Sequence, residues 1–357
     1  MREKLSWRRA GFLILNIVLA LGTCACLLAL LHLAGLLDSQ REAERWQGET
    51  ELSYCQLSCF LPADEGASLN DVYAFRSVML DRLREAVPDM ERLEGFFTDA
   101  WSTRGKLQVT SSRSRGDAVV IAVGGDFFEF HPLRLVSGTY IRESDLMQDR
   151  VLLDEDLAWL LFGGTELTGM EVRMGGKPFQ VAGVIRREQD FASRAAYTDG
   201  MGLFMSYSAY TELESKAGIS CYEVAMANPV KNFALNLTRE KFPIRDGLIV
   251  QNTGRFSYGR LMDLLTQFGR RSMQTRGIVY PYWENAARYV EDCCEILLLL
   301  AQLLAVLPVI SLCLWLRRRL LAGWTTLRED VIPTGLDNVR ESIRVRQRRR
   351  WEKKHRD

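Results

Sequence analysis

The sequence predicts an α+β extracytoplasmic domain flanked by two transmembrane helices. Among its 357 residues are two apolar runs without Asp, Glu, Lys or Arg, at 10–37 and 296–316. Each run is long enough to cross a hydrocarbon core of about 30 Å at about 1.5 Å per residue. Between them, segments with strand and helix patterns alternate, which is typical of layered α+β domains.

Basic residues predict the orientation of both spans. They precede the first run at Arg2, Lys4, Arg8 and Arg9 and follow the second at Arg317, Arg318 and Arg319. By the positive-inside rule, both termini are cytoplasmic. The first run exceeds the roughly 7 to 15 apolar residues of a cleaved signal peptide, which favours an uncleaved anchor in the plasma membrane. The predicted division is a cytoplasmic N-terminus (1–9), a first span (10–37), an extracytoplasmic domain (38–290), a second span (296–316) and a basic cytoplasmic tail (317–357).

The first elements of the outer domain follow from local patterns. Residues 38–50 are polar and predict a helical stalk, and 52–61 predict a strand. Ser68 and Asp71 have the spacing of a capping box, which predicts a helix starting there. The apolar stripe of this helix indicates that it lies on a sheet; its members are Leu69, Val72, Phe75, Met79, Leu80 and Leu83.

Strands and helices then alternate along the chain. Strands are predicted at 94–101, 106–111 and 118–123, followed by a break at Gly124–Gly125. VLLDED predicts a strand, LAWLLFG a helix stopped at Gly163, and EVRM with PFQVAGVI a hairpin around Gly175–Gly176. After a polar loop at 190–200, the predicted order is strand 202–207, helix 208–218, strand 220–227, a helix after Pro229, strand 247–252 and helix 257–269. The alternation predicts two subdomains, with the central one inserted.

The residue content argues against an enzyme. His131 is the one histidine of the outer domain and stands beside a proline, so the sequence offers no base next to a nucleophile. Asp154, Glu155 and Asp156 lie at a strand-to-helix junction, where acids cap the helix, although a carboxylate pair for glycoside hydrolysis stays open. No nucleotide fingerprint and no C-x-x-C pair are present. We therefore predict no catalytic, cofactor-binding or metal-binding residues.

Five cysteines would face an oxidising compartment. Cys55 and Cys59 share one face of the first strand about 13 Å apart, too far to form a disulfide with each other. A bridge from one of them to Cys221, a bridge from Cys293 or Cys294 to a partner chain, and reduced buried thiols all stay open. The basic tail predicts electrostatic attraction to anionic lipid headgroups, and no nucleic-acid partner is predicted.

Three stretches carry a family resemblance. AVVIAVGGDFFEFHPLRLVSGTYI, RVLLDEDLAWLLFGGTELTGMEVRMGGKPFQVAGVI and GLFMSYSAYTEL occur in this order. Together they resemble the extracytoplasmic core domain of MacB-like, FtsX-type ABC transporter permeases. The matching positions are Gly138, 154–163, 169–184 and Ser206–Tyr207.

The resemblance implies a porter-like and a strand-rich subdomain, and a dimer driven by a separate cytoplasmic ABC ATPase. Such permeases have three spans after the outer domain, whereas this sequence has one. The expected function is a non-catalytic membrane component or accessory subunit of an efflux or mechanotransmission complex, as a homodimer or a heterodimer with a full-length permease. The alternative is a two-span receptor that binds a ligand or protein.

The structural roles expected from the sequence concern turns, the core and one long helix. The segment from Trp283 to Leu304 has no glycine or proline and predicts one stiff helix from the outer domain into the membrane. Gly138, Gly163, Gly169 and Gly183 are expected in turns. The residues expected in the core are Phe127, Phe128, Leu157, Leu160, Leu161 and Phe162.

Overall fold

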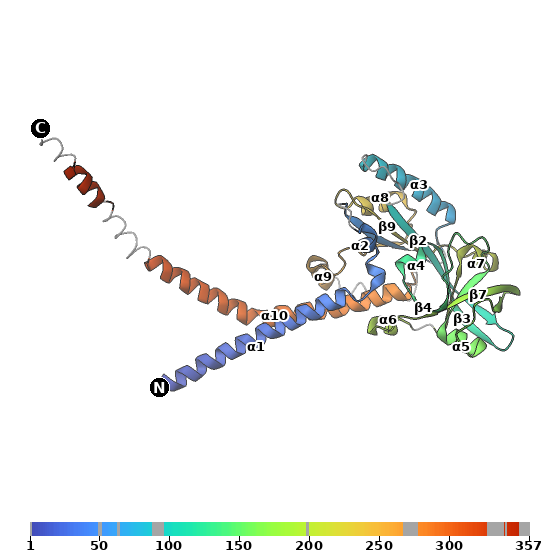
Figure 1. The fold of residues 1–357 in the computed structure, drawn as a ribbon, viewed down its shortest axis with the longest axis horizontal. Helices are drawn as coiled ribbons and strands as arrows, with labels where there is room; N and C mark the ends of the chain where they lie inside the picture. Colours follow the sequence, from blue (N-terminus) through green and yellow to red (C-terminus); the bar gives the residue numbers. More distant parts are fainter. Residues whose placement is uncertain are drawn as a thin grey trace. The chain divides into compact units, whose positions relative to one another are not determined.

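The structure is a computed structural model that describes residues 2–48, 52–62, 65–87, 96–197, 200–266, 278–326, 339 and 341–349 (Figure 1). It divides into two compact units, Met1–Ala29 with Ile296–Asp357, and Leu30–Glu295. The elements are, in order, α1 (Arg2–Ala34), η1 (Asp38–Gln40), α2 (Glu42–Gln47), β1 (Tyr54–Phe60), α3 (Leu69–Ala86), β2 (Phe97–Thr110), β3 (Arg115–Gly125), α4 (Phe127–Phe130), β4 (Arg134–Gly138), β5 (Arg150–Asp154), α5 (Glu155–Phe162), β6 (Glu171–Met174), β7 (Lys177–Arg186), α6 (Phe191–Ala196), β8 (Gly202–Ser206), α7 (Tyr207–Leu213), β9 (Cys221–Ala227), α8 (Phe233–Lys241), β10 (Leu248–Gln251), α9 (Tyr258–Leu265) and α10 (Tyr282–Thr326).

Two helices are long and apolar enough to cross a membrane. One is α1 at Ala10–Ala34, and the other is α10 within Tyr282–Ala322. The first helix ends at Ala34, three residues before the predicted end of the span. The second runs without interruption from Tyr282 to Thr326, with Pro308 inside it, so the predicted continuous helix from Trp283 to Leu304 is confirmed.

The Leu30–Glu295 unit is built on one ten-stranded sheet. The strand order is β10-β1-β9-β2-β3-β8-β5-β7-β4, and β6 pairs with both β2 and β7. The β3–β8 and β5–β7 pairs are parallel, and the other pairs are antiparallel. Helices α3 and α8 contact each other, and α8 contacts β1, while α5 contacts β3, β5 and β7 (Figure 1). The mixed class predicted from the sequence is confirmed.

The two predicted subdomains are joined within this sheet. Strands β3 to β8 lie between β2 and β9 in chain order, as expected for an insertion. One hydrophobic core nevertheless combines both groups of strands, with Leu57 of β1, Phe75 of α3, Val120 of β3 and Leu153 of β5 all buried. The two groups of strands therefore form one compact unit.

The strands predicted at 94–101 and 106–111 are one strand. β2 runs from Phe97 to Thr110, and its pairing with β3 continues through Gly105, from Ala100 opposite Gly125 to Thr110 opposite Arg115. The glycine did not end the strand because the long antiparallel partner fixes the backbone on both sides of it. Residues 94 and 95 lie outside the described residues.

The predicted stalk is part of the domain. Ser39, Gln40 and Glu42 are buried, and Gln56 of β1 accepts a hydrogen bond from Glu42 N at 2.9 Å and donates one to Ser39 O at 2.7 Å. The segment is helical as predicted, at Asp38–Gln40 and Glu42–Gln47, but it packs into the domain and is not a free polar stalk. Residues 49 and 50 lie outside the description.

Several local predictions are confirmed, and others need correction. The capping box of Ser68 and Asp71 is formed, and Gly163 ends α5 in the left-handed conformation. The loop predicted at 190–200 contains α6. Leu160 is 42% exposed rather than in the core. Gly138 is the last residue of β4 and lies opposite Gly183 inside β7, so neither glycine is in a turn. Residues 267–269 of the last predicted helix and most of the tail, including 327–338 and 350–357, are not described.

Candidate functional site

The first turns of α10 are enclosed by the outer domain. Pro281 precedes the helix, and its carbonyl accepts a hydrogen bond from Asn285 N at 3.1 Å. Glu284 in the first turn suits the positive end of the helix dipole. The buried residues of this segment are Tyr282, Trp283, Glu284, Ala286, Ala287, Val290, Glu291, Cys294 and Glu295. We call the segment Tyr282–Glu295 with its contacts the α10 anchor.

A buried ionic cluster holds one face of the anchor. Arg255, in the loop after β10, donates to Glu284 Oε2 at 2.7 Å and to Glu291 Oε1 at 2.7 Å. These two glutamates are two helical turns apart and therefore share a face. Arg255 also donates to Gln40 Oε1 at 3.1 Å, and Arg288 donates to Glu284 at 2.7 Å. The Arg255 cluster thus links the segment that follows α1 to the start of α10 within the same unit.

Aromatic rings pack against the first residues of the helix. The ring of Trp283 lies 5.6 Å from that of Phe127 and 4.3 Å from the imidazole of His131. Tyr282 stacks on Tyr197 with centroids 4.2 Å apart. Both tyrosine hydroxyls donate to Glu188, that of Tyr282 at 3.3 Å. Ring contacts of this kind fix the relative orientation of the side chains in addition to burying apolar area.

His131 belongs to a buried polar network. Its Nε2 lies 2.6 Å from Glu223 Oε2, and Ser58 Oγ donates to the other oxygen of Glu223 at 2.8 Å. Asn252 Nδ2 donates to Ser58 Oγ at 2.8 Å, and Asn252 O accepts from Arg255 N at 3.0 Å. All these side chains are buried. The network therefore joins β1, β9 and α4 to the Arg255 cluster and stacks a histidine on the anchor.

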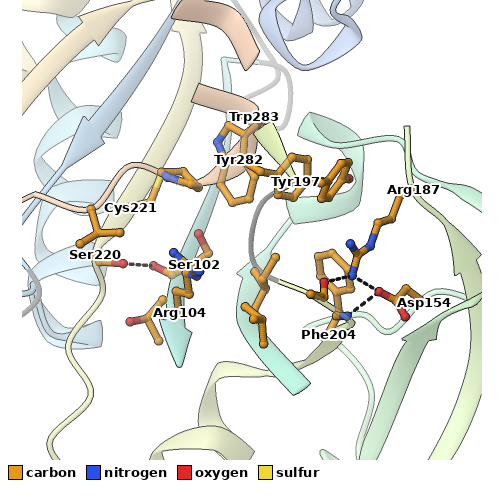
Figure 2. Close-up of a pocket in the computed structure, with 17 residues that line it drawn as sticks. Ser102, Arg104, Asp154, Arg187, Tyr197, Phe204, Ser220, Cys221, Tyr282 and Trp283 are labelled. Carbon is orange, nitrogen blue, oxygen red and sulfur yellow. Dashed lines mark hydrogen bonds and ion pairs between the residues drawn. The ribbon is translucent and has the colours of Figure 1, made fainter. Parts of the chain in front are cut away.

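A cavity lies beside the anchor (Figure 2). Its volume is about 50 Å³. Figure 2 shows Tyr282, Trp283 and Tyr197 together along one side and the Arg187–Asp154 ion pair on another. Asp154 also caps α5 by accepting from Leu157 N at 2.7 Å. Burial raises the pKa of Asp154, and the charge of Arg187 opposes that shift. The hydrogen bond from Leu157 N gives Asp154 the helix-capping role that its position in the sequence predicts.

The structure excludes one of the disulfide pairings that the sequence leaves open. All eight cysteines lie in the described part of the chain, and each is a free thiol. Cys59 faces Tyr222 in the β1–β9 pair, and Cys221 faces Phe60. Cys55 and Cys59 share one face, whereas Cys221 points to the other, so the bridge to Cys221 is excluded by register. Burial raises the pKa of Cys55 to about 11, which keeps the thiol protonated.

Sequence reasoning named only part of this site. Trp283 begins the predicted stiff helix, but Arg255 and its two glutamate partners are not among the residues singled out from the sequence. Its glutamate partners lie 29 and 36 residues further along the chain. The available signal was the pair of acids two turns apart at the start of an apolar helix. In the described residues no group of three or more His, Cys, Asp or Glu is placed to hold a metal ion, and the expectation of no metal site stays a prediction.

Comparisons with known proteins agree with the resemblance seen in the sequence. The family model for the MacB-like periplasmic core domain matches residues 17–235. The periplasmic region of MacB from Actinobacillus actinomycetemcomitans is 16% identical, with 61% of this chain and 94% of that chain covered and a TM-score of 0.39. The extracellular domain of the ABC-type transporter YknZ from Gram-positive bacteria is 14% identical, with 56% and 100% covered and a TM-score of 0.38. No curated protein matches the chain. Since the family model covers more than half of the sequence, the chain belongs to the family of MacB-like ABC transporter permeases that carry this periplasmic core domain.

Proposed function

We propose that this protein is a non-catalytic membrane component or accessory subunit of an ABC-type efflux or mechanotransmission complex. Its outer domain passes conformational change to or from the membrane through α10. Both termini lie in the cytoplasm, and 38–290 lie outside the plasma membrane. The partners are a separate cytoplasmic ABC ATPase and a second permease chain, either another copy or a full-length permease.

The observation that carries the proposal is the Arg255 cluster. One guanidinium binds Gln40, which follows the first span, and Glu284 and Glu291 at the start of the helix that contains the second span. A continuous helix transmits a displacement at one end to the other only if that end is held firmly. The buried ion pairs and the aromatic contacts of Trp283 and Tyr282 supply that hold.

Purification of the full-length protein from its native membrane, followed by mass spectrometry, tests the partners. We expect an ABC ATPase together with a second permease chain. Recovery of a cytoplasmic signalling protein, or of no ATPase, would overturn the transporter assignment.

A variant then tests the transmission step. The quadruple variant Arg255→Met, Arg288→Met, Glu284→Gln, Glu291→Gln removes both cations and both anions of the cluster. We expect it to retain the partners but to lose the dependence of ATPase activity on the outer domain's ligand or partner. The matched control Arg173→Met, Glu171→Gln removes an exposed pair and should behave as wild type. If the ATPase activity of the cluster variant depends on the outer domain's ligand or partner as strongly as that of the control, transmission through the α10 anchor is contradicted.

One observation favours a second candidate, a two-span receptor. The cavity next to the anchor is lined by Pro281, Tyr282 and Trp283, so a molecule bound there would touch the start of α10 directly. Recovery of a cytoplasmic signalling protein instead of an ATPase would support this alternative.

A further inference from the structure

A second hollow adjoins the cavity beside the α10 anchor. It has a volume of about 570 Å³, larger than that of the first, which is about 50 Å³. Thr103, Arg104, Ser220 and Val279 line both, so the two are neighbours that share one wall. We call the combined space the Arg104 cleft.

The cleft opens where β2 leaves its neighbour. Pairing of β2 with β9 ends at Ser102 opposite Cys221, and β2 meets β6 only at Thr110. Within the described strands, none pairs with this edge of β2 between those two positions. Along this stretch Thr103 is buried, Arg104 is half-buried and Lys106 is exposed.

The wide end of the cleft is basic. Lys106 and Lys216 line it, with Arg104, which already has an interaction partner, and one carboxylate, that of Glu214. Neither lysine has an ion-pair partner in the part of the chain that the structure describes. Several cations around one hollow create a positive potential that attracts an anion. A carboxylate or phosphate group fits this end.

The narrow end is apolar and next to the helix. Its apolar lining consists of Val119, Ile121, Phe204, Val279, Pro281, Tyr282 and Trp283. The charges of Arg187 and Asp154 at this end are paired with each other. The volume of this end, about 50 Å³, has room for only a short hydrocarbon chain. An apolar group placed here gains from leaving water.

We propose that the Arg104 cleft binds an anionic amphiphile, with its carboxylate or phosphate group at Lys106 and Lys216 and its short apolar chain against Val279 and Trp283. An inorganic anion would leave the apolar end empty, and a neutral hydrocarbon would not use the cations. The bound chain touches the residues that begin α10, so occupancy favours whichever state of the anchor holds it better. This inference goes beyond the proposed function and does not depend on an ATPase partner.

Binding of octanoate to the full-length protein tests the proposal. The protein is placed in nanodiscs of phosphatidylcholine, and isothermal titration is corrected with empty nanodiscs. We expect saturable binding about tenfold tighter than that of octanol or acetate, because each probe lacks one of the two recognised groups. Octanol binding as tightly as octanoate would overturn the proposal.

Variants test the assigned ends. Lys106→Glu with Lys216→Glu should weaken octanoate about tenfold. Val279→Asp, at a position that is 58% exposed and so tolerates a charge, should weaken it to a similar degree. The matched control Lys231→Glu changes an exposed lysine beyond the other end of β9 and should bind as wild type. Unchanged affinity in the Lys106, Lys216 variant, with its thermal unfolding intact, would also overturn the site.

A third titration identifies the source of the ligand. Replacing part of the phosphatidylcholine with phosphatidylglycerol should weaken octanoate binding if the headgroup of a membrane lipid enters the cleft. If the affinity is unchanged, the site is assigned to a water-borne amphiphile. Both results require that octanoate binds, so both support a cleft that binds an anionic group at one end and an apolar chain at the other.

Discussion

Arg255 Nη1 lies 2.7 Å from Glu284 Oε2, and the two side chains are only 2% and 1% exposed. A charge pair this deeply buried costs desolvation energy, which is offset only when both partners are present and well hydrogen-bonded. Here the guanidinium makes two contacts to Glu284, two to Glu291 and one to Gln40. The geometry therefore meets that condition. Removing one partner should leave the desolvation energy of the others without compensation.

Substitution of Arg255 by methionine should lower the free energy of unfolding by about 3–5 kcal/mol, because it removes the cation that two buried glutamates share and leaves Arg288 as the cation bound to Glu284. Thermal and denaturant unfolding of the full-length protein would measure the loss. Arg173→Met is the control, since Arg173 and Glu171 are 62% and 55% exposed and such pairs contribute about 1 kcal/mol or less. A loss as small as that of the control would contradict the Arg255 cluster.

We expect Glu42 to make the folded protein less stable as the pH rises. The carboxylate of an ordinary salt bridge has the opposite effect. Burial raises the pKa of Glu42 above the ordinary value of 4.5, and Arg45 offsets only part of that effect. A raised pKa means that the stability contributed by this group is fully present below pH 4.5 and is lost as the pH rises through the folded-state value. Glu42→Gln should therefore be more stable than wild type at neutral pH, and the difference should vanish below pH 4.5.

Unfolding free energies of wild type and Glu42→Gln, measured from pH 4 to neutral, would check this. Glu44→Gln serves as the control because Glu44 is exposed, with 64% of its side chain accessible. A difference between wild type and Glu42→Gln that grows on acidification would mean that the Arg45 ion pair outweighs burial.

The helix and strand patterns of the sequence predict most of the fold, because local capping and periodicity determine where these elements lie. The capping box at Ser68 and the turn at Gly163 are examples. The stalk prediction failed for a tertiary reason. Residues 38–47 are polar, but Gln56 of β1 hydrogen-bonds Glu42 N and Ser39 O inside the domain. Polarity predicts exposure only where no buried partner is available.

The candidate site was harder to predict because its members are distant in the sequence. Arg255 contacts residues 215 positions before it and 36 after it, so no window pattern marks it. Cys221 illustrates the same limit. Its side relative to Cys59 depends on the register of β1 against β9, which becomes visible only once the strands are paired.

Neighbouring leucines of α5 should respond very differently to a charge. Leu161 is fully buried and Leu160 is 42% exposed. Leu161→Glu should destabilise the outer domain by about 4 kcal/mol or more, because it buries a carboxylate without a partner. Leu160→Glu should cost about 1 kcal/mol. Limited proteolysis and thermal unfolding would compare the two, and equal protease resistance would contradict the assigned face of the helix.

Two glycines with the same backbone conformation should differ in their tolerance of alanine. Gly138 and Gly163 have φ of 77° and 75°, so a Cβ adds strain of about 1–2 kcal/mol at either position. At Gly138 that Cβ would also overlap the carbonyl oxygen of Ala182 and come within 2.6 Å of Gly183 Cα, whereas no described atom lies within 4 Å of one at Gly163.

Gly163→Ala should therefore cost about 1 kcal/mol. Gly138→Ala should cost about 3 kcal/mol or more, because β4 must also move away from β7. Unfolding free energies of the two variants give the comparison, and hydrogen exchange of the β7 amides reports whether the strand pair opens. Equal losses would show that left-handed strain alone matters and that the close approach of Gly138 to Gly183 does not determine the β4–β7 pairing.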